Sequence, residues 1–160
     1  MRRSVPVLAC ILLLAGPAFL PALSRADLDR VIDFSVTLKS LATAADSGSP
    51  IPTGKTVLIS GTVSDVNIIT KDQAGFKVRI ELITGEWIGT EDVKAYSCYV
   101  EFTGAEYFAL FPARPPRTAS RDLVTQNSRV LVVGRVVDVT TTPLGAKRVL
   151  LDGAYIRTTE

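Results

Sequence analysis

The chain has 160 residues, with 18 lysines and arginines against 16 aspartates and glutamates, and it contains no histidine. This length fits one domain, and 47% hydrophobic and 21% charged residues are typical of a globular protein. The absence of histidine excludes Ser-His-Asp and Cys-His catalysis, His-ligated metal or haem, and a histidine pH switch. The two cysteines are too few for a Cys-rich zinc site.

Residues 1–26 have the pattern of a secretory signal peptide. Two arginines follow the initial Met, residues 5–20 are apolar, and small residues at Ser24 and Ala26 suit a signal peptidase. We therefore expect cleavage after Ala26 and a secreted protein, located in the periplasm of a bacterium. An uncleaved membrane anchor is the alternative, although the apolar stretch is shorter than the roughly 20 residues of a spanning helix.

Removal of this segment changes the charge of the protein. It takes away three arginines and no acidic residue, which leaves 15 basic and 16 acidic residues in the mature chain. A nearly neutral domain lacks the broad positive field of a non-specific nucleic-acid binder. Cys98 is then the only cysteine, so an internal disulfide is impossible.

Residues 27–54 come next and are interpreted as an N-terminal extension and linker. Apolar and polar side chains alternate over residues 32–39, which favours a strand. The spacing of Leu28, Ile32 and residues 38–42 also permits a helix, and the pattern leaves both structures open.

The most informative pattern is an internal repeat. Residues 57–66 (VLISGTVSDV) match residues 130–139 (VLVVGRVVDV) at six of ten positions. Both segments are rich in β-branched residues and predict strands. Gly61 and Gly134 hold the same place in the two segments, where a strand that curls to close a small barrel has no room for a side chain. Chance similarity between two Val-rich strands is the alternative.

Two strands are expected between the repeated segments. Residues 76–82 and 96–102 alternate apolar and polar side chains with the period of two that marks a half-buried strand. The second strand places Cys98 on its apolar side, where a thiol packs as a small hydrophobic group. We therefore interpret Cys98 as a buried structural residue.

A short helix and a last strand complete the pattern. Thr103 and Glu106 have the spacing of a capping box, and the apolar residues after them predict a short helix that ends at Pro112. The last strand covers residues 148–156. The predicted order is therefore three strands, a short helix and two strands.

This order is that of an OB-fold, a five-stranded Greek-key barrel that often binds oligonucleotides or oligosaccharides on its second and third strands. We expect an all-β protein with one short helix, in which residues 55–160 form an OB-fold-like barrel. A longer β-sandwich is the alternative architecture.

From about residue 55 to residue 157, the chain resembles the tRNA-anti-like OB-fold family, which includes secreted and lipid-anchored bacterial proteins. Residues 54–63, 96–102 and 130–136 carry this resemblance. It implies a relation to nucleic-acid-binding barrels. A departure is the proline- and arginine-rich connection over residues 112–121. A weaker likeness, to the small periplasmic bacterial OB-fold proteins, rests on the segment Gly-Glu-Trp-Ile-Gly that begins at residue 85.

Candidate ligand contacts occur in two parts of the predicted barrel. Lys77, Arg79 and Tyr99 share the solvent face of the second and third strands, where acidic residues on the same strands offer cross-strand partners. Trp87 lies in a glycine-flanked segment, residues 84–91, that we expect to be a loop. There it either anchors a protein or sugar ligand or packs over the open end of the barrel.

A third candidate is the cluster of Arg114, Arg117 and Arg121, which suits an anionic partner. Acidic residues are scattered singly, and no phosphate-binding glycine loop occurs, so neither a cofactor nor a metal is expected. We predict a secreted, non-catalytic binding module for a protein, an oligosaccharide or an envelope component. Single-stranded nucleic-acid binding is the alternative for the same fold, and a metal-assisted hydrolase is the alternative from another class.

Overall fold

The computed structural model describes residues 24–114 and 123–159. Two helices, α1 (Arg25–Val31) and α2 (Leu38–Ser47), are separated by the two-residue strand β1 (Ile32–Asp33). The elements that follow are β2 (Thr56–Thr70), β3 (Lys77–Ile88), β4 (Asp92–Thr103), the 3₁₀ turn η1 (Ala105–Tyr107), β5 (Arg129–Thr141) and β6 (Lys147–Thr158). None of the helices in the described part of the chain has the length and apolar character to cross a membrane.

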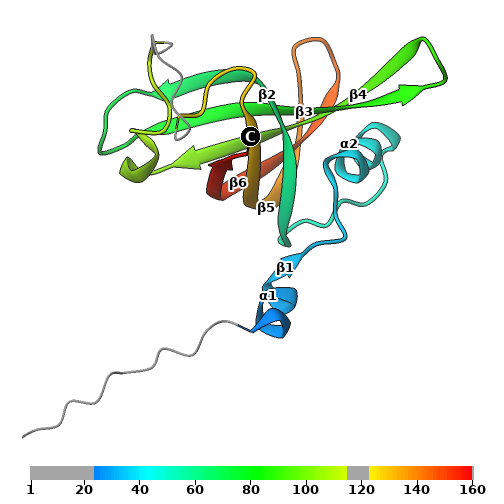
Figure 1. Ribbon diagram of the computed structural model, residues 1–160, viewed down its shortest axis with the longest axis horizontal. Helices are drawn as coiled ribbons and strands as arrows, with labels where there is room; N and C mark the ends of the chain where they lie inside the picture. The colour runs from blue at the N-terminus through cyan, green and yellow to red at the C-terminus, as the bar shows by residue number, and fades with distance from the viewer. Residues whose placement is uncertain (1–23, 115–122, 160) are drawn as a thin grey trace, which may run out of the picture.

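The five long strands close into a barrel (Figure 1). Their order is β2-β3-β4-β6-β5, and β5 returns to pair with β2. All neighbouring pairs are antiparallel except β4 and β6, which run parallel. This closed five-stranded ring is the OB-fold, so the predicted fold class is confirmed and the sandwich alternative is wrong.

The two repeated segments are direct neighbours in this barrel. Residues 56–62 of β2 pair antiparallel with residues 129–135 of β5. At Thr62 β2 pairs with both β5 and β3, and beyond it with β3, so Gly61 lies next to the point where the strand changes partners. A Cβ atom on Gly61 would lie only 3.0 Å from the carbonyl oxygen of Ile83. The missing side chain therefore lets two strands approach β2 at one point.

The interior of the barrel is a single apolar cluster that also includes one face of α2. The alternating residues that were expected to face inward, Phe76 just before β3 and seven residues of β3 and β4, are buried: Phe76, Val78, Ile80, Leu82, Tyr96, Cys98, Val100 and Phe102. The buried face of α2 consists of Leu38, Leu41, Ala42 and Ala45. The segment before the barrel thus contributes to the same core as the strands.

The helix α2 settles the alternative that the sequence left open for this segment. Thr37 and Ser40 form a reciprocal capping box, in which each side-chain oxygen accepts a hydrogen bond from the other residue's backbone N–H. Gly48 ends the helix in the left-handed conformation, with φ of 69°. Of the strand that the alternation over residues 32–39 favoured, only the two residues of β1 form, because Thr37 caps the helix that begins at Leu38.

The expected helix between the third and fourth barrel strands is shorter than predicted. Gly104, with φ of 140°, is the cap of η1, and no side chain caps this turn, so the predicted capping box at Thr103 is wrong. The turn covers three residues, and its last residue, Tyr107, is buried at the end of the barrel together with Phe111. Both rings pack against Phe102 there, and burial of these rings outweighs continuation of the helix.

The segment 84–91, expected to be a loop, is mostly strand. β3 continues to Ile88, which pairs with Asp92 at the start of β4. β2 pairs with β3 no further than Ile83, so the β3–β4 hairpin projects beyond the barrel at the upper right of Figure 1. β3 and β4 continue to pair with each other beyond the last residue of β3 that pairs with β2.

Candidate functional site

The outer face of β3 and β4 brings together three of the predicted contacts, but an acid engages both of its bases. Glu101 lies between Lys77 and Arg79: Lys77 Nζ is 2.7 Å from Oε2, and Arg79 Nε is 2.9 Å from Oε1. The Arg79 guanidinium lies 5.6 Å from the centre of the Tyr99 ring. The cross-strand pairing that the sequence suggested for these charges is therefore present.

Glu101, the carboxylate at the centre of this network, is largely buried. The Glu101 side chain is only 16% exposed. Its burial opposes ionisation, but hydrogen bonds from Lys77 and Arg79 outweigh that effect, so the pKa of Glu101 lies below its usual value. Nearby, Glu81 lies 3.7 Å from Nε of Arg148. Three bases thus face two acids, and this surface has no strong positive field.

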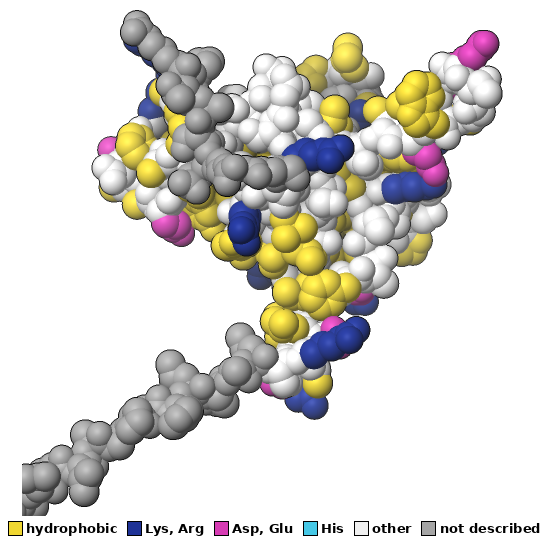
Figure 2. All heavy atoms as spheres, in the orientation of Figure 1, with side chains coloured by type: hydrophobic (Ala, Val, Ile, Leu, Met, Phe, Trp, Pro, Cys, Tyr) yellow, Lys and Arg dark blue, Asp and Glu magenta, His cyan; other side chains and the backbone are white. Residues whose placement is uncertain are grey.

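Trp87 lies on the projecting hairpin, and its side chain is 70% exposed. Val93 is directly opposite on β4 and is also exposed. We call these two residues the Trp87–Val93 pair. Figure 2 shows hydrophobic side chains along the hairpin at the upper right. The alternative in which Trp87 packs over the barrel is wrong, because most of its ring contacts solvent.

The opposite face of the hairpin is fastened to α2. Glu86 lies 2.6 Å from Lys39 Nζ and accepts a hydrogen bond from the Tyr96 hydroxyl. These two hydrogen bonds hold the pKa of Glu86 below its usual value. The ammonium groups of Lys39 and Lys94 lie over the Tyr96 ring, 5.7 and 5.4 Å from its centre. The hairpin thus presents the Trp87–Val93 pair on a supported strand rather than on a free loop.

A cleft with a volume of about 440 Å³ opens where β2 and β3 separate. Gly61 lines the cleft from β2, Gly85 from β3 and Arg129 from β5. Gly85 precedes Trp87 by two residues in β3, so both face the same side of the strand. The cleft therefore adjoins the Trp87–Val93 pair; we call it the strand-junction cleft. The strand-junction cleft could not be predicted from the sequence, because its position depends on where β2 changes partners.

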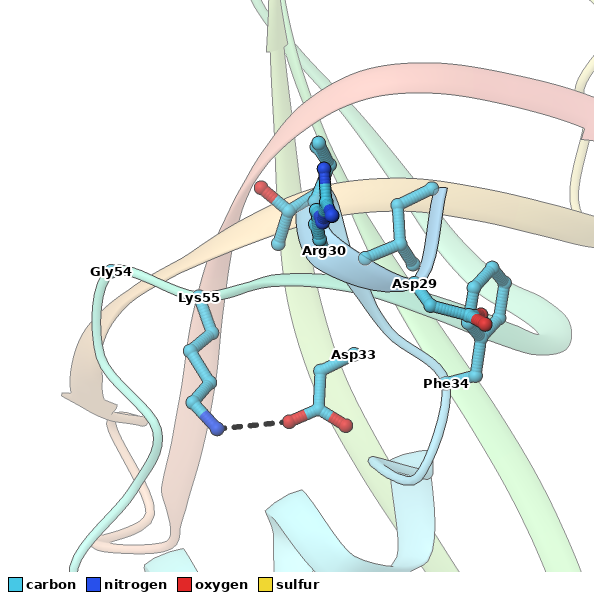
Figure 3. Close-up of a pocket in the computed structure, with 9 residues that line it drawn as sticks. Asp29, Arg30, Asp33, Phe34, Gly54 and Lys55 are labelled. Atoms are coloured by element: carbon cyan, nitrogen blue, oxygen red, sulfur yellow. Dashed lines mark hydrogen bonds and ion pairs between the residues drawn. The ribbon is translucent and has the colours of Figure 1, made fainter. Parts of the chain in front are cut away.

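A second hollow lies between α1, β1 and the start of β2 (Figure 3). Lys55 Nζ lies 3.0 Å from an oxygen of Asp33. Asp33 also accepts hydrogen bonds from the Ser35 hydroxyl and backbone N–H. The bond from the Ser35 hydroxyl, then that from Lys55 and then that from the Ser35 backbone lower the pKa of Asp33 to about 2. Arg30 in the same hollow lies 3.6 Å from Asp27. The Lys55–Asp33 pair fastens the N-terminal segment to the barrel, whereas the Arg30–Asp27 pair lies within α1.

The other predicted residues lie elsewhere. Cys98 is fully buried, and desolvation raises the pKa of its thiol to about 12, so the thiol is uncharged at neutral pH. Arg114 is exposed, whereas Arg117 and Arg121 lie outside the described residues. Among residues 24–114 and 123–159, no group of three or more cysteine, aspartate or glutamate side chains is placed to hold a metal ion.

The sequence matches no family model and no curated protein sequence. Among solved structures, an aspartyl-tRNA synthetase from Entamoeba histolytica is 17% identical, with a TM-score of 0.45, and the match covers 99% of this chain and 28% of that chain. The single-stranded DNA-binding protein from Thermus aquaticus is 15% identical, with a TM-score of 0.42 and coverage of 66% and 50%. The N-terminal domain of PriB from Thermoanaerobacter tencongensis is 12% identical, with a TM-score of 0.38 and coverage of 66% and 96%.

These likenesses concern the fold alone. The chain spans less than a third of the synthetase and half of the Thermus protein. Membership of the tRNA-anti-like family stays a prediction.

Proposed function

We propose that this protein is an exported, non-catalytic binding module that recognises a protein partner through its β3–β4 hairpin. The observation that carries this proposal is the exposure of Trp87, at 70%, opposite the exposed Val93 on a hairpin that projects from the barrel. Large aromatic residues dominate the binding energy of protein interfaces. Trp87 lies on a strand whose other face is fastened to α2, so the hairpin loses little conformational entropy when a partner binds.

The apolar surface of Trp87 is large enough to contribute substantially to the free energy of binding. Covering an exposed Trp ring removes on the order of 150 Å² of apolar surface from water, which corresponds to about 4 kcal/mol before the costs of association. The Trp87–Val93 pair is thus large enough to act as an interface anchor, although a complete interface also needs surrounding contacts.

Single-stranded nucleic acid is the second candidate ligand, on the outer face of β3 and β4. The observation that favours it is the Arg79 guanidinium over the Tyr99 ring, since stacked bases and backbone phosphates are bound by such aromatic and basic groups. A protein partner is favoured because Glu101 engages both Lys77 and Arg79. Displacing that carboxylate from a half-buried network would cost the charge pairing that it provides.

The export part of the proposal rests on the sequence pattern of residues 1–26. It is compatible with the core, because α1 buries none of its side chains. Cleavage after Ala26 would remove Ser24, whose side chain and backbone form the capping box of α1 with Asp27. The barrel would keep all of its packing.

Site-specific photocrosslinking tests the proposed function. A benzoylphenylalanine replaces Trp87 in the full chain, in cells of the source organism, and a matched variant carries it at Leu144, which is 97% exposed in the β5–β6 turn. We expect a discrete protein adduct from position 87 that position 144 does not give. A nuclease-sensitive adduct would favour the second candidate, and equal adducts from both positions would contradict the proposal.

A further inference from the structure

We infer that the strand-junction cleft binds an extended peptide segment carrying an acidic side chain, which adds as a strand to the free edge of β3. This inference rests on the proposed protein-binding function and specifies the form of the partner. Three features of the cleft support it: an unpaired strand edge, a hollow that opens onto this edge, and one arginine that has no acidic partner among the described residues.

The unpaired edge belongs to the hairpin. The pairing of β2 with β3 ends at Thr62 and Ile83, and residues 84–88 pair only with β4 in the described part of the chain. One edge of this five-residue segment therefore has backbone N–H and C=O groups without a neighbouring strand. Such an edge is a template for another extended chain, and strand addition is a recurring mode of peptide recognition.

The cleft gives a peptide access to this edge. It is lined by residues of β2, β3 and β5 and by Thr159, and no residue of α2 lines it. Gly85 lies on the edge itself, where a Cβ atom would be 3.2 Å from the Val93 side chain. Gly61 faces it from β2. A Cβ atom on Gly61 would meet the Ile83 carbonyl oxygen and the Leu38 side chain, so both glycines make room for atoms of this chain. A peptide therefore reaches the edge through the cleft that these residues line.

Arg129 supplies the charge preference. It lines the cleft from the start of β5 and is exposed. No ion pair among the described residues involves Arg129. Glu86, the acidic residue on the free edge, is already engaged by Lys39. A guanidinium without an acidic partner favours a carboxylate, which it binds with two parallel hydrogen bonds.

A displayed library of random ten-residue peptides, selected on the full chain, tests this inference. We expect the bound peptides to be enriched in aspartate or glutamate at one position. Trp87 is the only tryptophan of the chain, so a shift in its emission on titration with a selected peptide measures the affinity. Arg129→Glu should weaken that peptide at least about tenfold and should select basic residues instead. Lys147→Glu, the same charge change at the far end of β6, should leave the affinity unchanged.

The backbone contact has its own test. In a selected peptide, N-methylation of alternate amides removes the donors that face one side of the strand. One set should abolish binding, and the other set should change it little, because only one edge of the peptide meets β3. Equal effects of the two sets would overturn strand addition. No selected peptide, no acidic preference, or unchanged binding to Arg129→Glu would overturn the inference as well.

The outcomes separate this inference from the proposed function. Suppose that position 87 crosslinks to a protein while the library yields no peptide: the strand-junction inference then fails alone. Trp87→Ala has no tryptophan emission, so its affinity for a selected peptide is measured by titration calorimetry beside the wild type. Equal affinities would contradict the role of the Trp87–Val93 pair and leave strand addition to β3 supported.

Discussion

Gly61 lies directly opposite Val130 across the β2–β5 ladder, and Gly134 lies opposite Val57. Because the repeated segments begin at Val57 and Val130, each glycine faces the first valine of the other segment. The repeat therefore describes two antiparallel strands related by an approximate local twofold axis. At both glycines a Cβ atom would lie 3.0 Å from a carbonyl oxygen of a third strand, that of Ile83 or of Asp152.

Valine at either glycine should destabilise the fold. Gly61→Val and Gly134→Val should each lower the free energy of unfolding by about 1–3 kcal/mol, because the added side chain pushes against a neighbouring backbone that cannot rotate away. Thermal or denaturant unfolding measures this. Gly75→Val is the control, since a Cβ there meets nothing closer than 3.9 Å. Unchanged stability of both variants would contradict the role of these glycines in closing the barrel.

Alanine at Gly153 should destabilise the fold. A methyl group at this position would overlap the ring of Phe102, which is fully buried. We expect Gly153→Ala to cost about 1–3 kcal/mol of stability, and we expect Phe102→Leu to recover part of that loss in the double variant. A double-mutant cycle measures this coupling, and strictly additive effects would show that the two positions do not share this space.

The thiol of Cys98 should be inert in the native protein. Its pKa is raised from 9.0 to about 12 by burial, so a thiol reagent at pH 8 should label it only as fast as the protein opens. The folded state retains this proton to higher pH than the unfolded state does, so the Cys98 contribution to stability should fall as the pH rises above about 9. Rapid labelling of the folded protein would contradict this.

Removal of the Glu101 charge should make the outer face of β3 and β4 more basic. We expect the wild type to bind a twenty-residue oligothymidylate weakly, with an affinity that changes little with salt. Glu101→Gln releases Lys77 and Arg79, and the slope of log affinity against log salt should become more negative by about 0.7 for each phosphate contacted. Glu91→Gln, in the exposed hairpin tip, is the control. A steep slope for the wild type would instead favour nucleic acid as the ligand.

Export should leave Asp27 at the N-terminus of the mature protein. Mass spectrometry of the exported form checks this cleavage point, and a larger mass that includes residues 1–26 would indicate an uncleaved anchor. A chain that begins at Asp27 should melt at the same temperature as the longer chain, because α1 buries no side chain. A lower melting temperature would show that α1 supports the barrel.

The strands of the barrel were predictable because each carries its own signal. Residues 76–82 and 96–102 alternate between core and solvent, and that period does not depend on which strands are neighbours. The hairpin was predicted less well, since residues 84–91 contain two glycines and read as a loop. They pair as strands because β4 lies beside them in register, from Gly85 opposite Ala95 to Ile88 opposite Asp92. Cross-strand pairing within the hairpin overrides the preference of the two glycines for a loop here.

The sequence by itself determined the barrel, through the order of its strands and the repeated glycines, because side-chain period and missing Cβ atoms act within a few residues of each position. Only the tertiary structure decided which acid engages Lys77 and Arg79, that Trp87 contacts solvent and that the edge of β3 is open beside Arg129. These features arise where strands distant in sequence meet or separate, and strand register is set by the packing of the whole core.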